Sequence, residues 1–542
     1  MPDRQILDFL IQYFATEVNW MDQLVYLPWF LGKYQAWWNV KRITHVVGVD
    51  FAVLILRICS YTLQFLPSPG YTLDTIRGVS LAEIRNVCDD TADSLETIST
   101  AADNRGSLIR VQHVAFFGLQ CQIEAKANTF WEGLGRAIRI AQNIGIHCFS
   151  GDSKNDAEKL EREMERKTFC NLFIWDSLLS RQLDRIPTHP ERLRSEDWLK
   201  LHQLRSSSED DNTDPSNEGT DPFTERLLQA HLADFWRSFG PMQATEYDMI
   251  AAEERYDKLC NEYLPQLPPT FALKDADETC DKRYPKLPLQ RQLLHIAIYD
   301  SICWNFRPLF LRQPTPLPVY KSLILSSQKA KLAAAALLTL ASITRLHALL
   351  GDCHTRLASM IFSTFEAAVV LLFIYKDPLF EEDCPPQHLP PPGTLQSDPL
   401  QATMCNMSKA GCLEAVKGAL KRLKMLAEVS SMADVAANTL SQLMSNTIVS
   451  VESRSDTEEI PAAASVATET TTIMTSQPGP AFAVGGELAQ PWLSVDLNDL
   501  RGVNEEGVVM NGALALGDIA SWPVFDTANM GAQQPWMHLQ PM

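Results

Sequence analysis

The sequence lacks features on which several classes of protein depend. Its 12 cysteines include no Cys-x-x-Cys pair, and no charged and then apolar segment opens the chain as a signal peptide would. We therefore expect free thiols and a reducing compartment, the cytosol or the nucleus. Basic residues are in deficit, because 47 Lys and Arg face 66 Asp and Glu, a formal net charge of −19. This charge opposes binding to nucleic acid phosphates.

Long apolar runs are also scarce. The two longest cover residues 51–66, interrupted by Arg57, and 362–375, interrupted by Glu366. A transmembrane helix needs about 20 apolar residues. We interpret both runs as buried core helices and expect no membrane partner.

Strand signals are nearly absent before residue 450, because no run of alternating β-branched residues is bounded by hairpin turns. Apolar residues recur instead at helical spacing, and the predicted fold class is all-α. The segments predicted to be helical are 5–14, 49–66, 75–100, 108–127, 129–146, 156–182, 223–264, 290–306, 326–350, 357–375 and 404–444. The aromatic residues between 20 and 38 are predicted to form a packed turn, and Gly145 is predicted to end its helix.

The composition divides the chain into four parts. Residues 206–221, rich in Ser, Asp, Asn, Gly and Pro, separate a first helical half, 1–205, from a second, 222–450. Neither half has a linker that would isolate it, so we predict that both share one core. Lysine disappears after Ser450, and 451–542 is predicted to be a disordered acidic tail.

One cluster of carboxylates suggests catalysis. Asp89, Asp90 and Asp93 have the spacing with which helical terpene synthases hold divalent metal ions. Such enzymes need a second metal motif, and the nearest candidate has Gly502 where a hydroxyl ligand belongs. A solvated acidic helix face is the competing interpretation. We predict no enzyme activity and no catalytic, cofactor-binding or metal site, and keep a metal-dependent helical enzyme as the alternative.

The most informative segment lies between residues 129 and 187. There TFWEGLGRAIRIAQNIGIH is followed by EREMERKTFCNLFIWDSLLSRQLDRIP. This pair of helices resembles the middle homology region of fungal zinc-cluster transcription factors. The matching positions are Ala137, Ala141, Gly145, His147, Glu163, Arg166, Phe169, Phe173, Asp176 and Arg185. The likeness extends over residues 5–312, where a later helix ends in Arg307-Pro308, while Cys170 and the turn at 184–187 depart from the family pattern.

The resemblance implies a large helical regulatory domain in a nuclear regulator of RNA polymerase II genes, with a metabolic or secondary-metabolite gene set as its expected target. Family members carry zinc in an N-terminal cluster, and nothing before Gln5 encodes it, so this chain is expected to hold no cofactor. Either an upstream coding segment is missing or the protein acts without contacting DNA directly. The implied partners are a second copy or another transcription factor, and DNA only indirectly or through the missing module.

The predicted tail contains an acidic and aromatic segment. Trp492, Leu493 and Leu497 alternate with Asp496 and Asp499. This pattern is typical of activation segments that bind coactivators, although a merely solvating tail has a similar composition. We expect 451–542 to contact coactivators.

Asp176 raises a structural question of its own. It lies between Phe173 and Leu179 on an apolar helix face, where an unpaired carboxylate is costly. We predict that Asp176 is buried and bonded to an arginine or histidine. The candidate partners are Arg136, Arg139 and Arg181.

Overall fold

The computed structural model describes residues 1–40, 45–66, 75–148, 156–183, 185–189, 222–240, 247–311, 318–351, 357–377, 380 and 398–455. They fall into two compact units. Unit 1 comprises the described residues of Met1–Phe117 and Arg139–Thr168, and unit 2 those of Gly118–Ile138 and Phe169–Arg501. The segment predicted to be a linker, 206–221, and residues 456–542 of the predicted tail lie outside the described residues.

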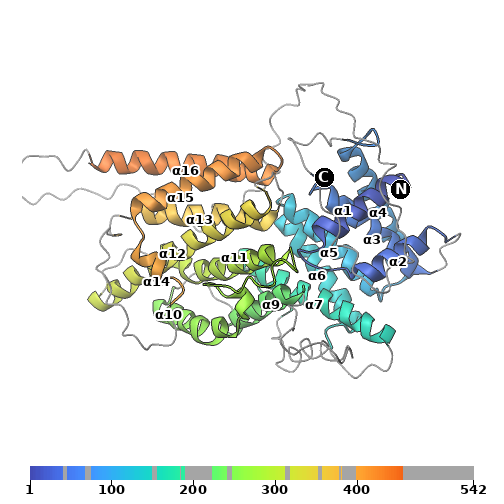
Figure 1. The fold of residues 1–542 in the computed structure, drawn as a ribbon, viewed down its shortest axis with the longest axis horizontal. Coiled ribbons are helices and arrows are strands. Elements are labelled where there is room, and N and C mark those ends of the chain that lie inside the picture. The colour runs from blue at the N-terminus through green and yellow to red at the C-terminus, as the bar shows by residue number, and fades with distance from the viewer. Residues whose placement is uncertain are drawn as a thin grey trace, which may run out of the picture. The chain divides into compact units, whose positions relative to one another are not determined.

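The described chain is all-α, as predicted (Figure 1). The helices are α1 (Arg4–Tyr13), α2 (Leu27–Trp37), α3 (Val46–Leu63), α4 (Leu81–Ala102), α5 (Leu108–Ile123), α6 (Ala127–Ile144), α7 (Asp156–Gln182), α9 (Thr224–Arg237), α10 (Met249–Lys258), α11 (Leu287–Phe306), α12 (Val319–Leu349), α13 (Ala358–Lys376), α14 (Gln401–Cys405), α15 (Lys409–Ala427) and α16 (Ser431–Ser455). Single π-helical turns follow α1 (Phe14–Val18) and α10 (Leu259–Tyr263), and 3₁₀ turns cover Leu264–Gln266, Pro269–Phe271 and Arg307–Leu311.

One short ribbon departs from the predicted helix at 75–100. Strands β1 (Thr75–Ile76) and β2 (Val79–Ser80) pair antiparallel, so α4 begins only at Leu81. The turn between them places Arg77 and Gly78 at φ 53° and 79°, the left-handed region that glycine adopts without strain. Ser80 then caps α4, because its hydroxyl accepts from the Glu83 amide at 3.1 Å.

Unit 1 is built around α3, whose residues from Asp50 to Leu63 are all buried. Two charges interrupt this apolar helix. Asp50 accepts hydrogen bonds from Ser107 at 2.8 Å, from Arg110 at 3.2 Å and from Ser99. Arg57 is 2% exposed. Arg57 contacts three carboxylates of α4, so both buried charges have partners, as buried ions must.

The aromatic residues between 20 and 38 do not form the predicted turn. Residues 27–37 are helix α2, whose buried ring of Phe30 lies 6.3 Å from that of Tyr34 and 5.7 Å from that of Phe51. The Tyr34 hydroxyl donates to Asp8 on α1 at 2.7 Å. The aromatic residues of this helix do not form one apolar stripe, since Phe30 and Tyr34 are buried while Trp29 and Trp37 are partly exposed, and so periodicity did not reveal the helix.

Unit 2 centres on α11, α12 and α13. α12 contacts α11 and α13, and α15 and α16 pack on α13, as the stacked helices in Figure 1 show. Four consecutive alanines of α12, at 333–336, are fully buried. Small side chains on every side of this turn allow neighbouring helices to approach closely.

Residues from both sides of 206–221 meet in unit 2. Cys170, Phe173 and Ile174 of α7 form one buried cluster with Phe223 and with residues of α9. That the two sequence halves form a single domain stays a prediction.

Two serines cap the starts of the helices in the last predicted segment, 404–444. The Ser408 hydroxyl accepts from the Gly411 amide at 3.0 Å at the start of α15, and Ser430 accepts from the Ala433 amide at 3.4 Å at the start of α16. Helix α16 continues to Ser455, beyond the boundary that the composition predicts at Ser450.

Three helices of the described residues are long and apolar enough to cross a membrane: α3, α12 and α13. Helix length thus does not exclude a span, contrary to the sequence argument, because α3 and α13 begin before the two apolar runs and α12 lies outside both. In the structure 78%, 61% and 67% of their apolar windows are buried inside the protein. This burial is what core helices require.

Candidate functional site

The helix that carries the family resemblance, α7, holds a buried ionic site. The Asp176 side chain is fully buried and accepts from the backbone amides of Thr188 at 2.9 Å and His189 at 3.0 Å. It also accepts from Arg237 of α9 at 2.8 Å. The predicted burial and arginine partner of Asp176 are confirmed.

Arg237 completes this site. Its guanidinium lies 4.0 Å from the centre of the Phe173 ring and donates to the Ser177 hydroxyl at 2.6 Å and to the His189 carbonyl. Burial lowers the pKa of Arg237, and Asp176 opposes that shift. The arrangement ties α7, α9 and the segment before residue 190 together, a structural role.

The three arginines proposed as partners of Asp176 were wrong. Arg136 and Arg139 are exposed on α6. Arg181 lies one turn beyond Asp176, but its Nε donates to the Ser177 carbonyl at 3.3 Å and its guanidinium lies 5.3 Å from the Trp304 ring centre. Sequence spacing on one helix could not reveal Arg237, which is 61 positions away.

The other residues of the resemblance are structural as well. Ala137 and Ala141 are buried, and Gly145 ends α6 at φ 84°, as predicted. Exposed Arg185 donates to Asn128 at 2.8 Å. The rest lie as follows: Phe169 faces the His189 ring at 5.3 Å, Glu163 pairs with Lys167 at 3.6 Å, burial lowers the pKa of Arg166, and His147 is half-buried.

The acidic cluster on α4 serves Arg57. The buried guanidinium of Arg57 contacts Asp93 at 2.5 Å, and Asp89 and Glu96 at 3.4 Å each. Asp90 and Asp93 are exposed. A carboxylate paired with arginine is not available to hold a metal ion, so no observation favours the terpene synthase alternative.

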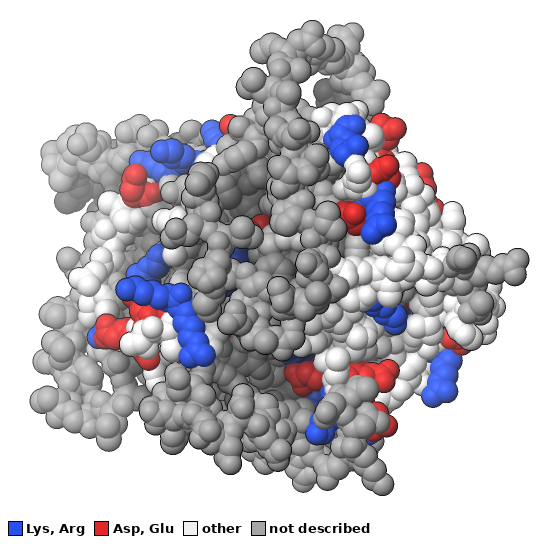
Figure 2. Space-filling model, turned by 45° about the vertical axis from the view of Figure 1, so that its right-hand side comes forward, with Lys and Arg blue, Asp and Glu red and all other residues white. Residues whose placement is uncertain are grey.

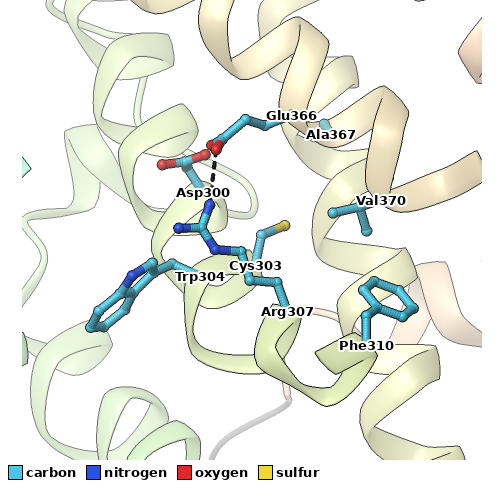
Figure 3. Close-up of a pocket in the computed structure, with 8 residues that line it drawn as sticks. All are labelled: Asp300, Cys303, Trp304, Arg307, Phe310, Glu366, Ala367 and Val370. Carbon is cyan, nitrogen blue, oxygen red and sulfur yellow. Dashed lines mark hydrogen bonds and ion pairs between the residues drawn. The ribbon is translucent and has the colours of Figure 1, made fainter. Parts of the chain in front are cut away.

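A pocket in unit 2 brings together residues that the sequence keeps apart (Figure 3). Asp300, Cys303, Trp304 and Arg307 follow one another along one face of α11 and its 3₁₀ extension, and Phe310 belongs to the same extension. Glu366, Ala367 and Val370 come from α13. The cavity measures about 20 Å³, room for one group the size of a water molecule.

The pocket lining contains two carboxylates and the guanidinium of Arg307, and the charge of Arg181 also acts on both carboxylates. Arg307 donates to Glu366 at 2.9 Å. No direct hydrogen bond or ion pair joins Asp300 to a residue that the structure describes. Burial raises the pKa of Glu366 to about 7, with Arg307 opposing and Asp300 reinforcing the shift. Burial likewise raises the pKa of Asp300 against the charges of Arg181 and Arg307.

Arg181 lies near this pocket, because its guanidinium is 5.3 Å from the ring centre of Trp304, a lining residue. Burial lowers its pKa to about 10, and the charge of Asp300 partly offsets that effect. Its Nη1 is buried without a hydrogen-bond partner among the described residues. The polar groups around the pocket are therefore incompletely satisfied, which in a native fold calls for an explanation.

Basic residues gather at one place that sequence analysis overlooked. Lys417, Lys421 and Lys424 are exposed along α15 at spacings of four and three residues. Glu414 offsets Lys417 at 3.6 Å. On the face drawn in Figure 2, basic and acidic side chains lie interspersed.

Two known proteins are similar over most of the chain. Transcription factor xilB of Penicillium rubens is 43% identical over 467 residues, which are 84% of this chain and 68% of xilB. Probable transcription factor sol4 of Alternaria solani is 37% identical over 502 residues, 90% of this chain and 87% of sol4. The chain belongs to this family of fungal transcription factors. No family profile matches it, and no solved structure matches it.

Membership of a transcription factor family agrees with the structural roles found for Asp176 and for Asp89 to Asp93. The pocket is the feature that sequence analysis missed. Its residues were visible separately, since Glu366 interrupts an apolar run and Arg307 ends the helix that resembles the family. The signal on α11 is the spacing of Asp300, Cys303 and Arg307 on one face, but nothing in the sequence predicts that α13 lies opposite.

Proposed function

We propose that this chain is a nuclear regulator of RNA polymerase II genes, acting through its helical part as a regulatory domain and through its acidic tail as an activation segment. The proposal rests chiefly on the similarity to xilB and sol4, which extends over 84% and 90% of the chain. The resemblance of α6 and α7 to the middle homology region supports the assignment of the helices to regulation.

The expected targets are genes of a metabolic or secondary-metabolite set. DNA contact is assigned to a zinc-cluster module or a partner factor rather than to the described helices, and the partner is a second copy or another transcription factor. The charge of −19 supports this division, because the approach of the helical domain to phosphates is unfavourable.

A reporter experiment tests the activation segment. The full chain, fused to an unrelated DNA-binding domain, should activate a reporter gene, and a fusion ending at Ser455 should not. Ending there retains the whole of α16. Strong activation by the shortened fusion would contradict the role of the tail.

A matched variant tests whether activation depends on the apolar side chains of the tail rather than on its length. Replacing Trp492, Leu493 and Leu497 by glutamine preserves the acidic charge and removes the apolar groups that a coactivator groove would bind. Activation should fall with this variant as with the deletion. Unchanged activation would assign the activity to acidity alone or to another segment.

A second experiment tests whether the chain by itself recognises a DNA sequence. The purified chain should show no preference among DNA sequences in a selection from a random library. Weak binding through the α15 lysines would be abolished by moderate salt and by replacing Lys417, Lys421 and Lys424 with glutamine. Enrichment of a defined motif would contradict the proposal.

A further inference from the structure

The first turns of α12 expose a group of apolar side chains. Val319, Tyr320 and Leu323 keep 77%, 58% and 67% of their surface exposed. Leu323 follows the other two at spacings of four and three residues, so the three side chains lie on one side of the helix. Single exposed apolar residues are common, whereas a contiguous group of them marks an interaction surface. We call these three residues the α12 patch.

The charge around the α12 patch is positive. Helix α12 contains no Asp or Glu, and Lys321 lies within the turn that forms the patch. Lys329, farther along the helix, is paired with Asp377. Within the part of the chain that the structure describes, no ion pair engages Lys321. Its ammonium group is therefore available to a carboxylate, and the patch fits a partner that is both apolar and acidic.

The size of the patch favours a tethered partner. A stable complex between separate proteins buries about 20–30 residues on each side, and this patch has three large apolar side chains. A segment of the same chain needs fewer contacts, because the covalent link gives it an effective concentration on the order of millimolar. The occupant that suits the patch is thus a segment of this chain rather than a second copy.

The predicted acidic tail can reach this place. The helices end with α16 at Ser455, and Figure 1 shows the end of α16 and the start of α12 at the same, left-hand end of unit 2. Residues 456–491, 36 positions, separate Ser455 from Trp492. A flexible chain of that length spans on average about 35 Å, and about 120 Å when extended. The link is therefore long enough.

We propose that residues 492–500, WLSVDLNDL, dock on the α12 patch of the same chain. Trp492 and Leu497 lie against its apolar side chains, and Asp496 lies beside Lys321. The choice of this segment rests on the proposed activation role of the tail, since the same apolar side chains would enter a coactivator groove. Docking and coactivator binding therefore exclude each other, and α12 limits activation until a coactivator displaces it.

Photo-cross-linking within the full chain tests the proposal. Benzoylphenylalanine in place of Tyr320 should react with residues 492–500, which peptide mass spectrometry identifies. In place of Leu349, 49% exposed and about 40 Å away along the helix, it should not react with that segment. Capture of the segment from both positions, or from neither, would overturn the proposal.

A mixture of unlabelled and nitrogen-15-labelled chains distinguishes an intramolecular contact from a second copy. Because the segment and α12 belong to one chain, both peptides of each cross-linked pair should carry the same label. Pairs of mixed label in statistical proportion would assign the patch to a second copy and overturn the proposal.

Variants at exposed positions define the contact. The double change Val319→Ser and Leu323→Ser should lower the cross-link yield at least about tenfold, because it removes the apolar contacts. Ile98→Ser on α4, a residue 60% exposed, is the matched control and should leave the yield unchanged. Lys321→Glu should lower the yield about twofold to fivefold, and Asp496→Lys in the same chain should restore it. An unchanged yield in the double variant would refute this location.

The reporter fusion measures the consequence separately. The double change Val319→Ser and Leu323→Ser should raise activation severalfold, because it frees the tail, and Ile98→Ser should not. Unchanged activation would contradict the competition with coactivators. Cross-linking does not depend on transcription, so a chain that cross-links without activating refutes only the activation role, and one that activates without cross-linking refutes only the docking. Circular dichroism checks that each variant is folded.

Discussion

Replacing Asp176 by alanine should destabilise unit 2 more than any replacement of an exposed carboxylate. The side chain is 0% exposed and accepts three hydrogen bonds, so the variant leaves two amides without this acceptor and Arg237 without its counter-ion. Breaking a buried ion pair from one side costs about 3–5 kcal/mol. Arg237 keeps its bonds to Ser177 and His189, so we expect about 3 kcal/mol, roughly a hundredfold in the unfolding equilibrium.

Urea unfolding of the full chain measures this change in the free energy of unfolding. Circular dichroism and tryptophan fluorescence are the signals that monitor the unfolding. Trp175, 4% exposed, lies beside Asp176 in sequence and reports on this region. Glu414→Ala is the control, because Glu414 is 77% exposed and its pair with Lys417 is a surface contact. The control should unfold at the urea concentration of the parent chain.

A double-mutant cycle distinguishes the ion pair from simple loss of packing. The cycle uses the single variants Arg237→Met and Asp176→Leu and the double variant that carries both. The double variant should lose clearly less free energy of unfolding than the sum of the two single losses, because neither charge is then left buried alone. Additive losses, or an Asp176→Ala variant as stable as the parent chain, would refute the inference from burial.

Three further changes test other parts of the fold by the same unfolding assay. Arg57→Leu should cost about 3 kcal/mol because it removes the buried guanidinium that Asp89, Asp93 and Glu96 contact, whereas Asp90→Asn, on the exposed face, should change nothing measurable. Burial holds the pKa of His295 at about 4, below the ordinary 6.5, so its contribution of about 3 kcal/mol is present above pH 6.5 and lost as the pH falls toward 4; His295→Phe should remove this pH dependence. Gly118→Ala should cost about 1–3 kcal/mol because its methyl group would meet a buried phenylalanine ring, while Gly418→Ala, in open space on α15, should stabilise by up to about 1 kcal/mol.

The sequence predicted the helices well where one apolar stripe ran between clear ends. The predicted segment 156–182 coincides with α7, and Gly145 ends α6 as expected. Prediction failed where the signals were local and mixed: aromatic rings concealed α2, and the ribbon at Thr75–Ser80 was taken as the start of a helix. Two-residue strands are too short to show alternation.

The partners of individual side chains were harder to predict from the sequence than the helices. The apolar helix face predicted that Asp176 is buried, and burial of a carboxylate predicted an arginine partner. Both are found, but the partner Arg237 comes from a helix that periodicity cannot place beside α7. The pocket was hidden for the same reason, since the meeting of Asp300 with Glu366 depends on how α11 and α13 cross. The sequence shows that a buried charge requires a partner, whereas the packing of the helices determines which residue is that partner.

The bond between Asp176 and Arg237 has a consequence for the covalent continuity of the chain. It joins groups 61 positions apart, and Cys170 and Phe173 pack with Phe223 in the same cluster, across the residues from 190 to 221. We therefore expect that a single cleavage within that stretch does not release either piece, and that two fragments divided near residue 210 associate when they are expressed together.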